Sequence, residues 1–302
     1  MGHAYVTVDV FTDTAFGGNP LAVLPDARGL DAATMQRIAA EFGYSETTFV
    51  LPPEDPAHTA RVRIFTPGRE VPFAGHPNVG TALVLAWQGS CFGRPVTDAL
   101  LFEEGAGLVP VAIGRNAEGR ADRATLTAPQ RLTVGPEAEL AAVAACCALD
   151  PDRFDLSAHP PLLASVGLPF VFARLADRQA LADARPDLAA FERLAPQMPA
   201  PDIHLYVPGD GVRADIHARM FAPLDGVNED PATGSANAAL AGLLAHLDRR
   251  RDLTLALTIL QGEDIGRPSV LHATARKTAG AVEEIRIGGG AVRMMSGELH
   301  LP

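Results

Sequence analysis

Two stretches of the chain are apolar on every helical face, and each begins within almost the same heptapeptide. Residues 78–89 read NVGTALVLAWQG and follow His76-Pro77, while residues 236–247 read ANAALAGLLAHL and lie just after Asp230-Pro231. A helix that is apolar all round must be covered all round by other elements. Most of the remaining chain is short strand-like runs closed by glycine or proline. We therefore predict an α+β fold of two lobes, each a curled, barrel-like β-sheet around one central apolar helix.

The two heptapeptides indicate that half of the chain is duplicated. HPNVGTA (76–82) and DPATGSA (230–236) share proline, glycine, a hydroxyl residue and alanine at the same offsets. Upstream of them stand RIFTP (63–67) and RMFAP (219–223), at nearly the same separation. The polar stretch between the copies suggests an N-terminal lobe of residues 1–118 and a C-terminal lobe of residues 119–302, whose last strand is free to return to the first lobe.

The repeated motif is typical of a helix start. Proline suits the first helical position and the residue before it suits the N-cap, so we expect His76 and Asp230 to cap the two central helices. The free amides of a first helical turn attract anions. Gly80 and Gly234 would let a ligand approach the backbone closely. Taken singly, Asp230 could be only a cap and His76 only a structural histidine, but equivalent places in a duplicated half favour a site for a small acid in a cleft between the lobes.

Composition excludes several classes of partner. A net charge of −11 argues against nucleic acid, and no apolar run approaches the roughly 20 residues of a membrane span. The N-terminus lacks the pattern of a signal peptide. Three cysteines without a C-x-x-C pair suggest a reducing compartment, the cytoplasm. No histidine pair has metal-ligand spacing, and no G-x-G-x-x-G precedes a helix, so neither a metal nor a dinucleotide is expected.

Six segments, in order along nearly the whole chain, resemble the phenazine-biosynthesis isomerase (PhzF-like) family. They are DVFTDTAFGGNPLAV, GYSETTFV, VPFAGHPNVGTA, NEDPATGSANAAL, QGEDIGRPS and GGGAVRMMSGEL. The family is similar in fold to diaminopimelate epimerase and proline racemase. The resemblance implies a cofactor-free isomerase of a small carboxylic acid, with a tendency to form homodimers.

The resemblance also implies a residue that moves the proton, the glutamate of Ser45-Glu46-Thr47. Without the resemblance, Glu46 would pass as an outward-facing strand glutamate. The implied chemistry is removal of a proton from a carbon acidified by conjugation and its return to another carbon of the same π system. His76 would relay or stabilise the proton, and Asp230 would orient the substrate amine or His76. The residues expected to bind the substrate are Asn19, Ser45, Gly75, Gly80, Thr81, Gly234 and Ser235.

Two other functions stay open: an amino-acid racemase or epimerase, and a non-catalytic protein that binds a small acid. The related epimerases use one cysteine from each lobe. None of Cys91, Cys146 or Cys147 lies in either motif, so a two-thiol mechanism is disfavoured. The segment Gly266-Arg267-Pro268-Ser269 fits either a loop near the cleft or a dimer contact. The motifs do not identify the natural substrate.

Overall fold

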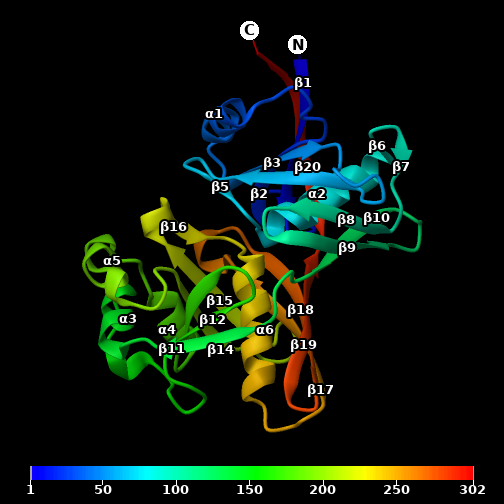
Figure 1. The fold of residues 1–302 in the computed structure, drawn as a ribbon. Coiled ribbons are helices and arrows are strands. Elements are labelled where there is room, and N and C mark those ends of the chain that lie inside the picture. The colour runs from blue at the N-terminus through cyan, green and yellow to red at the C-terminus, as the bar shows by residue number, and fades with distance from the viewer. Residues whose placement is uncertain (1, 302) are drawn as a thin grey trace. The chain divides into compact units, whose positions relative to one another are not determined.

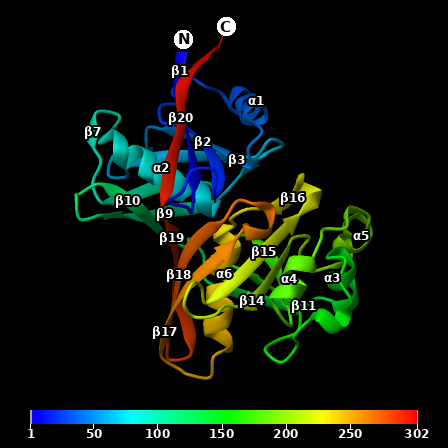
Figure 2. The same cartoon turned by 180° about the vertical axis from the view of Figure 1, so that it is seen from behind.

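The computed structural model describes residues 2–301, which form two units. One unit contains residues 2–129 and 286–301, and the other contains residues 130–285. The division expected from the sequence is at 118/119. That position lies in the turn between β9 (Gly107–Arg115) and β10 (Ala121–Thr127), which pair with each other and belong to the same unit. The last strand, β20 (Ala291–His300), pairs with the first, β1 (Gly2–Val10), and the two run side by side in both views (Figures 1 and 2).

In the N-terminal unit a sheet curls around α2 (Gly75–Gln88), whose residues are buried from Gly75 to Leu85. Following the pairing, its strands are β20, β1, β2 (Asn19–Leu24), β3 (Glu46–Leu51), β4 (Ala60–Phe65), β8 (Ala99–Glu104), β9, β10 and the end of β19 (Ala281–Gly289). The short strand β5 (Glu70–Val71) pairs with β4, and β6 (Ser90–Cys91) pairs with β7 (Arg94–Pro95).

A shorter helix, α1 (Ala32–Phe42), follows the sequence prediction closely. Asp31 caps it by accepting a hydrogen bond from the Thr34 amide, and Gly43 ends it in the left-handed conformation. The apolar side chains of Met35, Ile38 and Ala39 form its buried face.

The C-terminal unit is built around α6 (Gly234–Leu247), which Figure 1 shows packed beside the strands of this unit. Its residues are also buried along nearly the whole helix. Its strands are β11 (Thr133–Glu137), β12 (Leu162–Ser165), β13 (Pro169–Arg174), β14 (Ile203–Pro208), β15 (Ile216–Ala222), β16 (Val227–Asp230), β17 (Leu253–Gln261) and β18 (Ser269–Thr278). Its shorter helices are α3 (Leu140–Cys146), α4 (Arg178–Asp183) and α5 (Leu188–Leu194). The 3₁₀ turns are η1 (Pro151–Arg153), η2 (Ala195–Gln197), η3 (Pro223–Asp225) and η4 (Glu263–Ile265). Within residues 2–301, none of the helices has both the length and the apolar character that a membrane span requires.

The duplication is visible in the strand pairing. In the first unit β2 and β3 are parallel, β3 and β4 antiparallel, β4 and β8 parallel, and β8 and β9 antiparallel. The series β13, β14, β15, β17 and β18 repeats this order of directions in the second unit. The two-lobed α+β prediction is therefore confirmed, with one apolar helix per lobe.

The register of the repeat differs from the one that the heptapeptides suggested. In each unit an arginine holds a glutamate with two hydrogen bonds and lies over a phenylalanine ring. These residues are Arg63, Glu70 and Phe65 in one unit and Arg219, Glu229 and Phe221 in the other. Each central helix begins five residues after that glutamate, at Gly75 and at Gly234. The structure therefore aligns EVPFAGHPN (70–78) with EDPATGSAN (229–237).

This register corrects two predictions. His76 corresponds to Ser235 and not to Asp230, so the earlier alignment is wrong by five residues. Neither His76 nor Asp230 is a helix cap, because the N-cap residues are Ala74 and Thr233. Pro77 sits inside the first turn of α2, where its missing N–H costs nothing because first-turn amides have no partner within the helix.

Candidate active site

Glu46 and His76 meet in the N-terminal unit. Glu46 is the first residue of β3, where it pairs with Leu21 of β2, and His76 is in the first turn of α2. His76 Nε2 lies 3.5 Å from Glu46 Oε2. The side chain of His76 is 4% exposed and that of Glu46 is 19% exposed, so Glu46 is the more accessible partner.

The imidazole of His76 is neutral at neutral pH. Burial lowers the pKa of His76 to about 3, and a hydrogen bond to the Pro20 carbonyl opposes this more weakly. Nε2 has no hydrogen-bond partner among the described residues, so we assign the Pro20 bond to Nδ1–H. A neutral imidazole that donates from Nδ1 presents a lone pair at Nε2. His76 therefore offers Glu46 a hydrogen-bond acceptor.

Two of the expected binding residues hold the strand ends beside this pair. Ser45 Oγ donates a hydrogen bond of 3.0 Å to Asn19 Oδ1. Asn19 is fully buried at the start of β2, and Ser45 directly precedes Glu46. The contact fixes the ends of two parallel strands at the place where Glu46 leaves the sheet.

Gly80 and Thr81 lie one turn further along α2 and face the core. A Cβ on Gly80 would lie 2.6 Å from Leu21 Cδ2 and 2.8 Å from Val10 Cγ2. Thr81 Oγ1 lies 2.8 Å from Thr48 Oγ1, and both residues are fully buried. The prediction that Gly80 lets a ligand approach the backbone is therefore wrong, because this glycine lets α2 approach two strands.

The C-terminal unit places Asp230 beside the start of α6. The Asp230 carboxylate accepts a hydrogen bond of 2.6 Å from Thr233 Oγ1, and its backbone carbonyl accepts one of 2.7 Å from Gln261 Nε2. Thr233 is the N-cap, and Gly234 and Ser235 are the first two helical residues. Asp230, Gly234 and Ser235 are thus brought together within this unit, and both Asp230 and Ser235 are buried.

The sequence motifs missed a polar group behind each helix start. Asn78 and Asn237 each donate Nδ2 to the carbonyl of their helix's N-cap residue, at 3.0 Å. Gln261 Oε1 accepts from Asn237 Nδ2 at 2.7 Å and from the Thr233 amide at 3.1 Å, and Glu104 lies against Asn78. The Gly-x-x-Asn pattern shared by both copies in the corrected register is the signal that could have found the asparagines.

The cysteines are unsuited to proton transfer. Burial raises the pKa of Cys91 and of Cys146 to about 11, and it raises the pKa of Cys147 well above its usual range. All three are buried thiols rather than thiolates at neutral pH. A mechanism with two opposed thiols therefore has no support in this chain.

Known proteins match the chain over nearly its full length. A family model described as phenazine biosynthesis-like protein matches residues 8–297. The chain belongs to this family. It is 39% identical to an uncharacterized isomerase of Mesorhizobium japonicum over 98% of each chain. It is 35% identical to the trans-2,3-dihydro-3-hydroxyanthranilate isomerase of Pseudomonas aeruginosa, over 99% of this chain and 100% of the relative. This PhzF-like chain is an isomerase.

Solved structures give the same fold. A PhzF family protein of Bacillus anthracis matches over the whole of both chains with a TM-score of 0.88 and 26% identity. A hydroxyproline epimerase of Agrobacterium vitis matches 99% of this chain and 91% of its own with a TM-score of 0.67. At 14% identity the second likeness concerns the fold alone. The PhzF-like chain therefore has the diaminopimelate epimerase-like architecture.

Proposed function

We propose that this isomerase moves a proton between two carbons of a small unsaturated carboxylic acid, with Glu46 as the general acid and base and without a cofactor. The observation that carries the proposal is the contact between the partly exposed Glu46 carboxylate and the buried Nε2 of His76, at 3.5 Å. Catalytic contacts of this kind are often long in a free enzyme and tighten when the substrate binds.

The proton path follows from the neutral state of His76. Glu46 takes a proton from a C–H bond that conjugation has acidified, so the bonding electrons stay in the substrate π system and an O–H bond forms on Glu46. Because burial keeps the proton affinity of His76 low, the proton remains on Glu46, where His76 Nε2 accepts a hydrogen bond. The O–H bond then breaks as a C–H bond forms at the other carbon, and no net charge is gained or lost.

The substrate carboxylate is proposed to bind at the helix starts. Gly75 and His76 in one unit, and Gly234 and Ser235 in the other, occupy the first helical positions, whose amides have no partner within the helix. We propose that both starts serve one cleft between the lobes, with Asp230 orienting a substrate amine. The sequence duplication and the contact of Asp230 with the N-cap Thr233 support this arrangement.

The first candidate substrate is trans-2,3-dihydro-3-hydroxyanthranilate, for which the Pseudomonas aeruginosa relative is named. The enzyme is incubated in D2O with this compound and with a panel of unsaturated and α-amino acids, and NMR follows deuterium uptake. Deuterium uptake with migration of a double bond supports the proposal. Inversion of a stereocentre would assign a racemase instead, and no uptake from any compound would refute the proposed substrate class.

Glu46→Gln tests the role of the carboxylate. Removal of a general base lowers kcat about 10²- to 10⁴-fold, and KM should change little. Glu41→Gln, on the exposed face of α1, is the matched control and should keep wild-type rates. Equal deuterium exchange by wild type and Glu46→Gln would show that Glu46 is not the proton carrier.

A further inference from the structure

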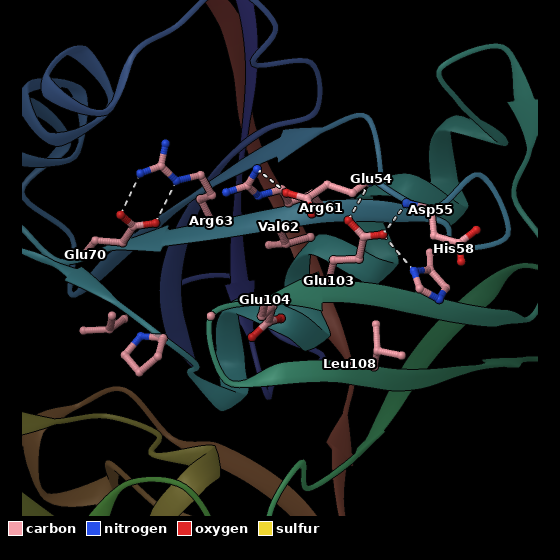
Figure 3. A pocket seen from close by; sticks show the side chains of 13 residues that line it. Glu54, Asp55, His58, Arg61, Val62, Arg63, Glu70, Glu103, Glu104 and Leu108 are labelled. Atoms are coloured by element: carbon pink, nitrogen blue, oxygen red, sulfur yellow. Dashed lines mark hydrogen bonds and ion pairs between the residues drawn. The ribbon is translucent and has the colours of Figure 1, made fainter.

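The end of β8 carries two consecutive glutamates in opposite environments, as Figure 3 shows. The Glu103 carboxylate accepts hydrogen bonds from the amides of Glu54 and Asp55, at 2.7 and 2.9 Å, and lies 2.7 Å from His58 Nδ1. Glu104 points to the other side of the strand. Both of its carboxylate oxygens are buried, and neither has a hydrogen bond of ordinary geometry to any described residue.

The side chain next to Glu104 is Asn78 of α2. Asn78 Nδ2 donates one hydrogen to the carbonyl of Ala74 and directs the other toward the Glu104 carboxyl group, and Asn78 Oδ1 is buried without a partner within residues 2–301. Two carboxylate oxygens and one amide oxygen, all acceptors, therefore share a single N–H donor. Buried acceptors without donors are costly, and a single proton on Glu104 supplies the missing donor.

The charged groups around Glu104 do not supply a compensating cation. It lines a pocket of about 730 Å³ in which both arginines and the histidine already have a glutamate partner (Figure 3). Those on β4, β5, β8 and the loop before β4 are Glu54, Asp55, His58, Arg61, Arg63, Glu70 and Glu103. The ionisable side chain at the start of α2 is His76, which is neutral. Burial raises the pKa of Glu104 to about 8, opposed only by Asn78, so the carboxyl group is protonated at neutral pH.

The C-terminal unit has an amide at the same place. β8 pairs with β4 as β17 pairs with β15, and in this register Glu104 corresponds to Gln261. The Gln261 side chain accepts hydrogen bonds from Asn237 and from the Thr233 amide, and it donates to the Asp230 carbonyl. A neutral carboxylic acid resembles a glutamine side chain in shape, and it too has both an acceptor and a donor.

We propose that Glu104 is a positioning residue that works as a neutral acid. Its carbonyl oxygen accepts from Asn78 Nδ2, as Gln261 Oε1 accepts from Asn237 Nδ2, and its O–H donates to Asn78 Oδ1, so that the pair holds the start of α2. His76 is two residues before Asn78 in the same turn, so the proton on Glu104 fixes the imidazole that faces Glu46. Loss of the proton places a negative charge against the amide oxygen and releases the turn. The effect on activity rests on the role proposed above for His76, whereas the protonation of Glu104 does not.

Glu104→Gln is the decisive variant, and the pH dependence of stability is its first readout. The folded protein keeps a proton on Glu104 that the unfolded chain releases near the ordinary carboxyl pKa. The contribution of Glu104 to the free energy of unfolding is therefore lost as the pH rises from about 5 to 8, and it does not change further above pH 8. For a chain of this length Glu104 lowers Tm by about 2 °C per pH unit in this range, whereas the buried His76 and His204 act in the opposite direction below pH 6.5. The slope of Glu104 is therefore the difference between the wild type and Glu104→Gln, which should lack it. The kcat/KM of Glu104→Gln should persist above pH 8, where that of the wild type falls.

Infrared spectra of the 13C-glutamate-labelled wild type give a second measurement that needs no variant to fold. A protonated carboxyl band at pH 7 that disappears above pH 8 supports the proposal. Glu103→Gln is the matched control and should keep both the band and the slope. Glu104 is not a neutral acid if the band is absent, or if Glu104→Gln keeps the wild-type slope. Full activity of His76→Gln would instead refute the proposed function and leave the state of Glu104 intact.

Discussion

Replacing His76 with glutamine tests the central electrostatic feature of the site, a buried imidazole kept neutral. Its pKa falls from the ordinary 6.5 to about 3 because burial penalises the charged form. Between these two pH values His76 is protonated in the unfolded chain but not in the folded protein. The free energy of unfolding therefore falls as the pH falls. Glutamine does not titrate, and it can preserve a hydrogen bond to the Pro20 carbonyl.

The size of the effect follows from the two pKa values. At pH 5 the solution is 1.5 units below the unfolded pKa of 6.5, so the imidazole is protonated in the unfolded chain and still neutral in the folded protein. The free energy of unfolding is therefore about 2 kcal/mol lower at pH 5 than at pH 7 or above. The full difference, about 5 kcal/mol, is reached only near pH 3. His76→Gln should therefore lose about 2 kcal/mol less than the wild type between pH 7 and pH 5.

Urea unfolding at pH 7 and pH 5, followed by circular dichroism, measures this difference directly. His204 is a matched comparison, because it is fully buried in the C-terminal unit and burial lowers its pKa to about 3 as well. His204→Gln should give a gain of similar size, and the two gains should add because the groups belong to separate cores. If wild type and His76→Gln lose the same free energy between the two pH values, His76 is not held neutral and the proton path through Glu46 loses its basis.

Two further substitutions test the packing of the helix starts. Gly80→Ala puts a methyl group 2.6 Å from Leu21 Cδ2, and the overpacking cost of about 1–3 kcal/mol should exceed the gain of about 1 kcal/mol in helix propensity. As the control, Gly68→Ala meets nothing within 4 Å, and its free energy of unfolding should stay within about 0.5 kcal/mol of the wild type. Gln261→Leu leaves the buried Thr233 amide without its acceptor and should cost about 1–3 kcal/mol in urea unfolding. Wild-type stability of either Gly80→Ala or Gln261→Leu would contradict the corresponding contact.

The apolar pattern was sufficient to predict the architecture. A helix such as α2 or α6 has no solvent-facing side, so a sheet must surround it, and this demand holds whatever the details of the strands. The ends of α1 were predictable for a similar reason, since Asp31 and Gly43 each satisfy a local backbone requirement. The local signals of α1 therefore held, whereas the caps predicted for α2 and α6 did not, because a proline inside the first turn does not mark the first helical residue.

The register of the repeat was not predictable from the heptapeptides. Proline and glycine recur near many helix starts, so a match of three identical residues and one hydroxyl residue in seven tolerates a slip of five residues. The arginine–glutamate pairs fix the register, but Arg63 and Glu70 lie on different strands, and their pairing depends on the β4–β5 hairpin. The contact of Glu46 with His76 is of the same kind, because it requires the parallel pairing of β2 with β3 and the packing of α2 against both.

The corrected register changes where the symmetry of the two helix starts is broken. His76 corresponds to Ser235 in the repeat, and Glu104 corresponds to Gln261. The N-terminal unit therefore carries a titratable side chain at two positions where the C-terminal unit carries a hydroxyl or an amide. The scaffold contact is the same in both units, since Asn78 and Asn237 donate to equivalent N-cap carbonyls. Under the proposed function, duplication accounts for both helix starts as anion-binding backbone, while Glu46 and His76 belong to one copy only. Exchanging Glu104 for glutamine gives both units an amide at this position, and it should remove only the pH sensitivity and not the fold.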